Sequence, residues 1–445
     1  MIVMKFGGTS VQNEEAISRV IDIVRGRLRE RPVVVVSALA RVTRSLVELA
    51  EEAEAQHPER VKEILDALRE RHFGLCRAML EGNLLEETLS KVGCMLDELQ
   101  AFAEGVCQIG ELSSRSRARI VSSGELLSST IVSAAMNTAG IVSHWADART
   151  MISTSGNYMA ATPDLGVTKA NVLRVIPEAS RGADVVLTQG FIASMADGSP
   201  CVLGFEGSDY SAAIFGMSLG AERVEIWTDV DGIRTSDPRK VRDTKRIDKI
   251  SYEEAAEMAW LGARVLHPMT IGPARMENIP IRVLNTMNPE GEGSLVMKGD
   301  RIPDGPKAVA VLDVDYLEVE TDQTGEVGDM LGHVMHVLKK HSVEASLVNS
   351  SKAKVSVTFE TGQDGLSDAV SEMAEKYKVT LYHDMAQVSV VGKNAALSEG
   401  VCGKVIAAAG APAMAEIGSS LMSVSVVVGR NDAGNVLSMI HESMF

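Results

Sequence analysis

The sequence has few cysteines, no long apolar run and no export signal. Its five cysteines are scattered without a C-x-x-C pair, which argues against a structural zinc site or disulfide framework and favours free thiols in a reducing compartment. No stretch approaches the roughly 18 consecutive apolar residues of a membrane-spanning helix. The N-terminus also lacks the basic, apolar and small-residue order of a signal peptide. These absences predict a cytoplasmic protein that does not associate with membranes.

Basic residues are scarce relative to acidic ones. Lys and Arg total 44 against 60 Asp and Glu, giving a net charge of −16, so nucleic acid is not expected as a partner. The G-x-x-x-x-G-K-[ST] spacing of a P-loop is absent as well. A small anionic ligand would therefore need local cationic sites. A chain of 445 residues with 45% apolar content is expected to fold into two or three globular domains.

The first ten residues could form one such cationic site. An apolar run over 2–6 carries Lys5 and leads into Gly7, Gly8 and two hydroxyl residues. Bare backbone amides at a turn entering a helix, together with a lysine, favour a polyphosphate. An ordinary strand–turn–helix with a surface lysine fits the same residues, so this segment alone does not decide between the two.

Further apolar runs predict a mostly parallel sheet, because strands buried on both faces read as near-continuous apolar segments. These runs cover 2–6, 33–36, 141–145, 185–188, 224–228 and 281–284. Between the second and third runs, apolar residues recur at helical spacing and predict packed helices.

After a turn-rich stretch at 288–306, the C-terminal third shows a different order of predicted strands and helices. The order strand, helix, strand, strand, helix occurs twice at a period of roughly 70 residues, which predicts two small α+β modules. The first copy is expected at 314–320, 327–340, 343–348, 354–359 and 366–377, and the second at 387–391, 398–409, 413–417, 422–428 and 433–443. The predicted domains are 1–296, a linker and lead-in strand at 297–312, and modules at 313–380 and 381–445.

Five later segments combine glycine, hydroxyl and charged residues next to predicted strand ends, where ligands bind in open α/β sheets. They lie at 37–44, 122–126, 204–210, 228–239 and 261–268. Each also has a structural interpretation. Thr43 and Ser208 suit helix N-caps, Glu125 and Asp209 suit the first turn of a helix, and His267 suits a structural histidine.

Taken in order, these segments resemble the aspartate kinases of the amino-acid kinase superfamily, and the C-terminal modules resemble that family's paired ACT domains. The motifs that carry the resemblance are KFGGTS at 5–10, GSDYSAA at 207–213, TDVDGI at 228–233 and VLHP at 265–268. The resemblance implies an α/β amino-acid kinase fold, a mostly parallel sheet sandwiched by helices, followed by two ferredoxin-like α+β ACT modules.

The resemblance further implies phosphoryl transfer from MgATP to the side-chain carboxylate of L-aspartate. The product, 4-phospho-L-aspartate, lies on the route to lysine, threonine, methionine and diaminopimelate. ATP and Mg²⁺ are then expected, and so is an amino-acid effector, lysine or threonine, at the ACT modules. A homodimer or higher homo-oligomer is also expected, from the family and from the apolar strand at 423–428.

Site residues carry over by motif. Lys5 and Asp209 are implied to be catalytic, and Ser37, Arg41, Thr43 and Glu125 to hold the amino acid, with Glu125 meeting its ammonium group. The residues implied to hold the nucleotide are Lys5, Gly7, Gly8, Ser208, Thr228, Asp229, Arg234, Arg239 and Arg264.

The sequence departs from the family at residues that bind the acceptor substrate. Phe205 stands where the family has an arginine that holds the substrate carboxylate. Arg41 or Arg44, in a loop where the family has Gly-Gly-Val-Thr-Asn, is expected to supply the missing guanidinium. In the first ACT-like module, Ser346 and Lys352 replace acidic residues of lysine-sensitive relatives, which argues against lysine as the inhibitor.

Two other functions remain open from the sequence alone. One is a kinase of the same fold that acts on another carboxylate, a carbamate or a nucleotide. The other is an ACT-bearing regulatory pseudo-kinase with a degenerate site.

Overall fold

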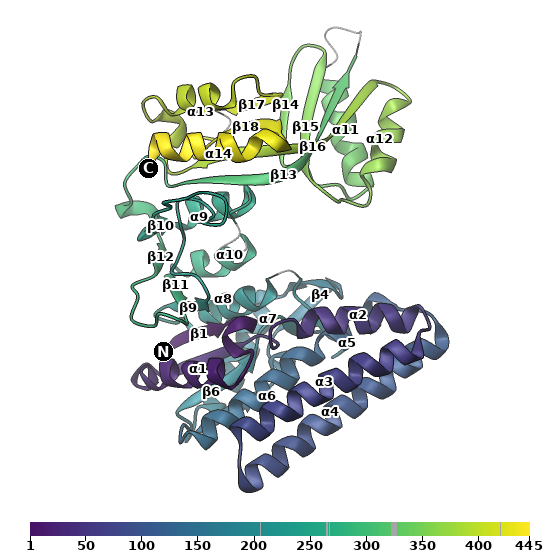
Figure 1. Cartoon of the computed structure of the whole chain (residues 1–445), viewed down its shortest axis with the longest axis vertical. Helices are drawn as coiled ribbons and strands as arrows, with labels where there is room; N and C mark the ends of the chain where they lie inside the picture. Colours follow the sequence, from purple (N-terminus) through teal and green to yellow (C-terminus); the bar gives the residue numbers. More distant parts are fainter. Residues whose placement is uncertain (205, 264–265, 267, 322–326, 419) are drawn as a thin grey trace. The chain divides into compact units, whose positions relative to one another are not determined.

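The structure is a computed structural model that describes every residue except 205, 264–265, 267, 322–326 and 419. The chain forms two compact units (Figure 1). The first contains Met1–Ile233 and Met269–Lys298, and the second contains Arg234–Pro268 and Gly299–Phe445. No helix among the described residues has both the length and the apolar character needed to cross a membrane.

The first unit is built on a sheet whose strands run in the order β12-β11-β9-β1-β2-β6-β3. All neighbouring pairs are parallel except β11 with β12. The three central strands are fully or almost fully buried, which explains their continuous apolar character. The strands are β1 (Ile2–Phe6), β2 (Pro32–Val36), β3 (Ser143–Ala146), β6 (Val185–Gln189), β9 (Val224–Thr228), β11 (Ile281–Asn285) and β12 (Ser294–Met297).

Helices cover this sheet, and α3 and α4 run side by side as a long antiparallel pair (Figure 1). Their apolar stripes join the largest core cluster, as the helical spacing predicts. The helices of the unit are α1 (Glu14–Arg25), α2 (Val42–Glu54), α3 (Pro58–Met79), α4 (Gly82–Ile109), α5 (Ser114–Val121), α6 (Ser123–Thr138), α7 (Leu165–Ala179), α8 (Gly207–Leu219) and α10 (Pro268–Met276).

A small second sheet, unexpected from the sequence, lies in the same unit. Its strands run in the order β5-β4-β7-β8. They are β4 (Ser153–Asn157), β5 (Ala160–Pro163), β7 (Ile192–Met195) and β8 (Pro200–Val202), and they are too short for a periodicity signal.

The second unit contains a six-stranded antiparallel sheet in the order β14-β15-β13-β16-β18-β17. The first copy of the predicted repeat is β13 (Ala308–Glu320), α11 (Val327–Lys340), β14 (Leu347–Ser350), β15 (Lys354–Glu360) and α12 (Leu366–Ala374). The second is β16 (Lys378–Val391), α13 (Val401–Ala409), β17 (Met414–Ile417), β18 (Ser423–Gly429) and α14 (Arg430–Met444). The unit also holds β10 (Lys249–Ser251) and α9 (Tyr252–Trp260).

Both long strands of this sheet serve both modules. The second half of β13, from Val314 on, pairs with β15, whereas its first half, 308–313, pairs only with β16. The second half of β16 pairs with β18. The lead-in strand that precedes the first module therefore completes the sheet of the second. The α/β fold with two α+β modules is confirmed, and β14 begins four residues later than the strand expected at 343–348.

Candidate active site

Three parallel strands end side by side at one edge of the first unit's sheet. Phe6 lies in register with Val36 of β2 and Trp227 of β9. The loops that follow are tied together, since the Gly7 amide donates to the Trp227 carbonyl at 3.3 Å and the Ser37 amide donates to the Phe6 carbonyl at 3.2 Å. The loops carrying the glycines, Ser37 and Thr228 are therefore neighbours.

A buried ion pair lies at this edge. Lys5 Nζ is 2.5 Å from Asp209 Oδ1, and the two residues are 9% and 6% exposed. Asp209 sits in the first turn of α8, where the helix dipole favours a carboxylate. A Cβ atom on Gly7 would lie 3.6 Å from the same ammonium, so bare backbone and a cation occur together, as the opening motif predicts.

Two glycines at this edge allow close approach of the chain. A Cβ on Gly8 would lie 2.9 Å from the Ala38 carbonyl oxygen, and a Cβ on Gly190 would lie 2.6 Å from Cβ of Ser208. Real Cβ atoms do not approach so closely, and in both cases backbone atoms lie within 3.0 Å. These positions therefore need glycine for space.

A cavity of about 440 Å³ opens beside these loops. It is large enough for a small polar metabolite. Its lining comes from the loops after β1 and β2, from helices α2, α5 and α6, and from segments around β5, β7 and α8. The lining residues are Gly8, Ser37, Ala38, Leu39, Ala40, Arg41, Thr43, Val47, Val121, Glu125, Met159, Phe191, Gly204, Glu206, Gly207 and Ser208.

Glu125 is the most unusual group in this lining. The residue is 2% exposed, and its Oε1 accepts a hydrogen bond from the Ala38 amide at 3.1 Å. Its Oε2 is buried without a hydrogen-bond partner. Burial raises the pKa of this carboxyl to about 8. A buried carboxylate oxygen without a partner is unfavourable unless a ligand supplies a donor or a cation.

Hydroxyl groups connect two of the lining loops. Ser37 Oγ donates to Ser208 Oγ at 2.9 Å, and Ser128 Oγ donates to the Ser37 carbonyl at 2.7 Å. Thr43 and Ser208 are not the N-caps of their helices, because Arg41 and Glu206 occupy those positions. Their hydroxyls are thus not required to cap a helix, which leaves them available to a ligand.

Three non-glycine lining residues adopt left-handed backbone conformations. The φ angles are +70° at Arg41, +67° at Phe191 and +53° at Glu206. Such conformations carry a cost of about 1–3 kcal/mol each and cluster at functional sites. The backbone around the cavity therefore has conformations that are typical of a functional site and that lower stability.

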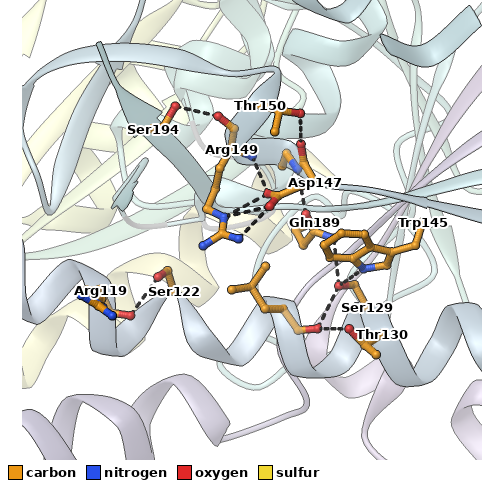
Figure 2. Close-up of polar contacts among 12 residues, drawn as sticks. Arg119, Ser122, Ser129, Thr130, Trp145, Asp147, Arg149, Thr150, Gln189 and Ser194 are labelled. Carbon is orange, nitrogen blue, oxygen red and sulfur yellow. Dashed lines mark hydrogen bonds and ion pairs between the residues drawn. The ribbon is translucent and has the colours of Figure 1, made fainter. Parts of the chain in front are cut away.

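A polar network that sequence reasoning missed supports the helix bearing Glu125 (Figure 2). Ser129 of α6 accepts hydrogen bonds at Oγ from Trp145 Nε1 and Gln189 Nε2, each at 2.9 Å. Gln189 Oε1 accepts from the Ala148 amide at 2.8 Å, and Arg149 pairs with Asp147 through Nη2 at 2.7 Å. These residues come from separate segments without a local motif, so no sequence signal marked them.

The other residues that the sequence predicts to bind the nucleotide are divided between the two units. Thr228 follows β9, and its Oγ1 donates to Asp229 Oδ1 at 3.2 Å. Arg234 and Arg239 belong to the second unit, where Arg234 Nε donates to Thr244 Oγ1 at 2.7 Å and Arg239 pairs with Asp237 at 2.9 Å. Phe205, Arg264 and His267 lie outside the described residues.

Comparison with known proteins agrees with this arrangement. A sequence profile of the amino acid kinase family matches residues 1–285. The chain belongs to this family, as its fold and the strand-end site indicate.

Longer alignments narrow the assignment. Lysine-sensitive aspartokinase 3 of Escherichia coli is 32% identical over an alignment covering 100% of this chain and 99% of that protein. The crystal structure of E. coli aspartokinase III with aspartate and ADP matches with a TM-score of 0.89 at 31% identity, covering 99% of both chains. The same enzyme with lysine and aspartate matches with a TM-score of 0.81, covering 100% of this chain and 99% of that one. Within the amino acid kinase family, the chain belongs to the aspartokinases.

Proposed function

We propose that the protein is an aspartate kinase that transfers the γ-phosphoryl group of MgATP to the side-chain carboxylate of L-aspartate. A carboxylate oxygen of aspartate forms a bond to the γ-phosphorus while the bond to the leaving ADP oxygen breaks, giving 4-phospho-L-aspartate and ADP. The acceptor is already an anionic nucleophile, so no general base is needed. Catalysis then rests on positioning and on neutralising charge at the transferred group.

The observation that carries this proposal is the unpartnered carboxylate oxygen of Glu125 inside the cavity. An amino acid's ammonium group would supply both the charge and the hydrogen bonds that this oxygen lacks. N-acylated amino acids and nucleotides carry no such group. The cavity therefore favours a free amino acid over the acceptors of other kinases of this fold.

The chain's residues take the following proposed roles. Lys5 neutralises the transferring phosphoryl group, and Asp209 holds the Lys5 ammonium in place. Backbone amides at Gly7 and Gly8 face the phosphates. Ser37, Arg41, Thr43 and Glu125 hold aspartate. In the first unit, Ser208, Thr228 and Asp229 hold the nucleotide. The resemblance to the aspartate kinases assigns the same role to Arg234, Arg239 and Arg264.

Mg²⁺ fits this site as an ion held chiefly by ATP. Among the described residues no group of three or more His, Cys, Asp or Glu side chains gathers to hold a metal, so phosphate oxygens and water would supply most of its ligands. When bound, the ion neutralises charge on the phosphates. Two acidic residues belong to this strand edge, Asp209 beside Lys5 and Asp229 directly after β9.

Residues 1–296 are proposed as the catalytic domain, and 313–380 and 381–445 as two ACT modules that respond to an amino acid such as lysine or threonine. The five thiols are all free, which supports the cytoplasm as the compartment. A homo-oligomer is also proposed, and sedimentation at micromolar concentration tests it. Its interface would not use β18, because this strand is buried between β16 and β17.

One assay tests the proposed reaction against its alternatives. ATP-dependent hydroxamate formation is measured with aspartate, glutamate and acetylglutamate, and ADP release is measured with UMP. Activity with aspartate alone supports the proposal. Activity with another acceptor identifies a different kinase of the same fold, and activity with none identifies a pseudo-kinase.

A further inference from the structure

We propose that Arg41, held in position by Arg71, binds the α-carboxylate of the amino acid acceptor. The proposal rests on the proposed function, because it assigns the residue that binds the α-carboxylate of the same substrate. It also distinguishes Arg41 from Arg44, between which the sequence leaves the choice open.

Arg41 is placed to act on a ligand in the cavity. It lines the cavity and forms the N-cap of α2, with φ +70° and ψ −9°. The side chain makes no capping hydrogen bond. Among the residues that the structure describes, no carboxylate pairs with it. Arg44, three residues further along, is exposed as Arg41 is, but it does not line the cavity.

Arg71 of α3 holds the loop that carries Arg41. Its Nη1 donates to the Ala40 carbonyl at 2.8 Å, and its Nη2 donates to the Gln12 carbonyl at 3.5 Å. Burial, followed by the charge of Arg41, lowers the pKa of Arg71. Because Arg71 bonds the carbonyl of the residue that precedes Arg41, the loop brings both cationic residues to this side of the cavity. Two cations kept together without an acidic partner in the described part of the chain mark a place for an anion.

The cavity thus presents an acidic group and a basic group that both lack an ionic partner. The Glu125 carboxylate has a buried oxygen without a partner, and the Arg41 guanidinium has no described carboxylate. An α-amino acid zwitterion carries the complementary pair, an ammonium and a carboxylate on one carbon. If Glu125 meets the ammonium and Arg41 meets the α-carboxylate, the side-chain carboxylate stays free for phosphoryl transfer. The pairing would also reject acceptors that lack an α-carboxylate.

The test compares L-aspartate with its α-amide, L-isoasparagine, which keeps the ammonium and the side-chain carboxylate but lacks the α-carboxylate charge. Arg41→Gln preserves a β-carbon at the left-handed position, so it does not change the backbone cost there. Arg44→Gln is the matched control. Loss of a charge-assisted contact is expected to lower kcat/KM for aspartate by about 10- to 100-fold, through KM.

The expected result is a change in preference as well as in rate. In Arg41→Gln the preference for aspartate over the α-amide should shrink by the same factor, with KM for ATP unchanged. Arg44→Gln should keep the wild-type preference. A folded Arg41→Gln enzyme that retains the full preference overturns the proposal, as does an Arg44→Gln enzyme that loses it.

Failure of the proposed function would look different. If the wild-type protein phosphorylates no acceptor, the kinase assignment fails, and calorimetric binding of aspartate and the α-amide to the same variants still decides the role of Arg41. Equal affinities of wild type and Arg41→Gln for aspartate would then overturn the proposal.

Arg71 is tested as a positioning residue. Arg71→Gln should raise KM for aspartate by about 2- to 10-fold, because the loop loses a hydrogen bond at Ala40. Arg71→Lys can still donate to that carbonyl and should recover most of the loss. A KM that is unchanged in Arg71→Gln, or not recovered in Arg71→Lys, overturns the positioning role.

Discussion

The cavity of the first unit and the sheet of the second unit differ in how they accommodate carboxylates. In the cavity of the first unit, Glu125 has a buried oxygen without a partner. In the second unit, the carboxylate of Glu318 accepts hydrogen bonds from Lys354 and from the Tyr316 hydroxyl. Glu372 there binds Lys340 and His341, and these hydrogen bonds lower its pKa to about 2.

This contrast separates charges used for ligand binding from charges used for structure. A paired carboxylate gains nothing further from a ligand, so its contribution is already part of the folded protein. An unpartnered buried carboxylate destabilises the free protein and recovers that cost only when a ligand binds. Raising the pKa of Glu125 from 4.5 to about 8 corresponds to roughly 5 kcal/mol against ionisation at about 1.36 kcal/mol per tenfold change in proton affinity.

The largest predicted effect comes from the buried ion pair between Lys5 and Asp209. Lys5→Met should lower kcat by about 10³-fold, because the transferring phosphoryl group loses its cation. It should also lower the free energy of unfolding by about 3–5 kcal/mol, since Asp209 is left buried and unpaired. Steady-state kinetics and urea unfolding measure the two effects.

A double variant separates the two roles of Lys5. Lys5→Met combined with Asp209→Asn removes both charges and should recover most of the stability while activity stays lost. If activity returned with stability, Lys5 would be a structural residue only. The Lys5–Asp209 pair would then resemble the pairs of the second unit.

Glu125→Gln should raise the free energy of unfolding and weaken aspartate binding. The folded state holds this carboxyl with a raised pKa, and the unfolded chain releases its proton above about pH 4.5. Burial of Glu125 therefore costs little below pH 4.5, and the cost grows as the pH rises towards 8. The glutamine variant should be more stable than wild type by about 3 kcal/mol at pH 7 and by less than about 1 kcal/mol at pH 5.

The same variant should bind aspartate more weakly, because it offers no charge to the ammonium group. Unfolding at the two pH values and calorimetric titration with aspartate measure both effects. Equal stability of the two proteins at pH 7 would show that Glu125 is ionised in the free protein. The cavity would then already satisfy its charge, and the contrast with the second unit would disappear.

Local pattern was enough to predict most elements but not these charge states. The runs at 2–6 and 224–228 match β1 and β9 end for end, because strands buried on both faces leave a plain apolar signal. The family resemblance that the motifs at 5–10 and 207–213 carry implied a common site for Lys5 and Asp209, and the two side chains form an ion pair. The partnerless oxygen of Glu125 depends on what packs around it, and no local pattern encodes that.

Long-range pairing accounts for the other differences. The first half of β13 completes the second module by pairing with residues 73 to 83 positions further along the chain, and a strand's own sequence does not specify its partner. The Thr235 carbonyl accepts a hydrogen bond from the Val309 amide, and its hydroxyl lies 2.8 Å from His441 Nε2, within the second unit. The network around Ser129 is likewise assembled from separate segments.

Two glycine substitutions should have opposite signs in the two units. Gly190→Ala would place a Cβ 2.6 Å from Cβ of Ser208 and should lower stability by about 1–3 kcal/mol, with a raised KM for aspartate. Gly434 lies inside α14, and apart from the neighbouring backbone of this helix no described atom is within 4 Å of its added Cβ. Gly434→Ala should raise stability by about 0.5–1 kcal/mol without changing the kinetics. Thermal unfolding and steady-state assays on both variants check these signs, and a neutral Gly190→Ala would show that the site tolerates looser packing.

The smallest effect is expected for a paired surface charge of the second unit. Arg430 Nη2 lies 2.6 Å from Asp313 Oδ2, and the two side chains are 52% and 40% exposed. Solvent screens such a pair, so Arg430→Gln should change the free energy of unfolding by less than about 0.5 kcal/mol and leave KM for aspartate unchanged. Urea unfolding and the aspartate assay measure both quantities. A loss above about 2 kcal/mol, or a changed KM, would mean that paired charges of the second unit also serve the reaction, and pairing would no longer distinguish structural from functional charges in this protein.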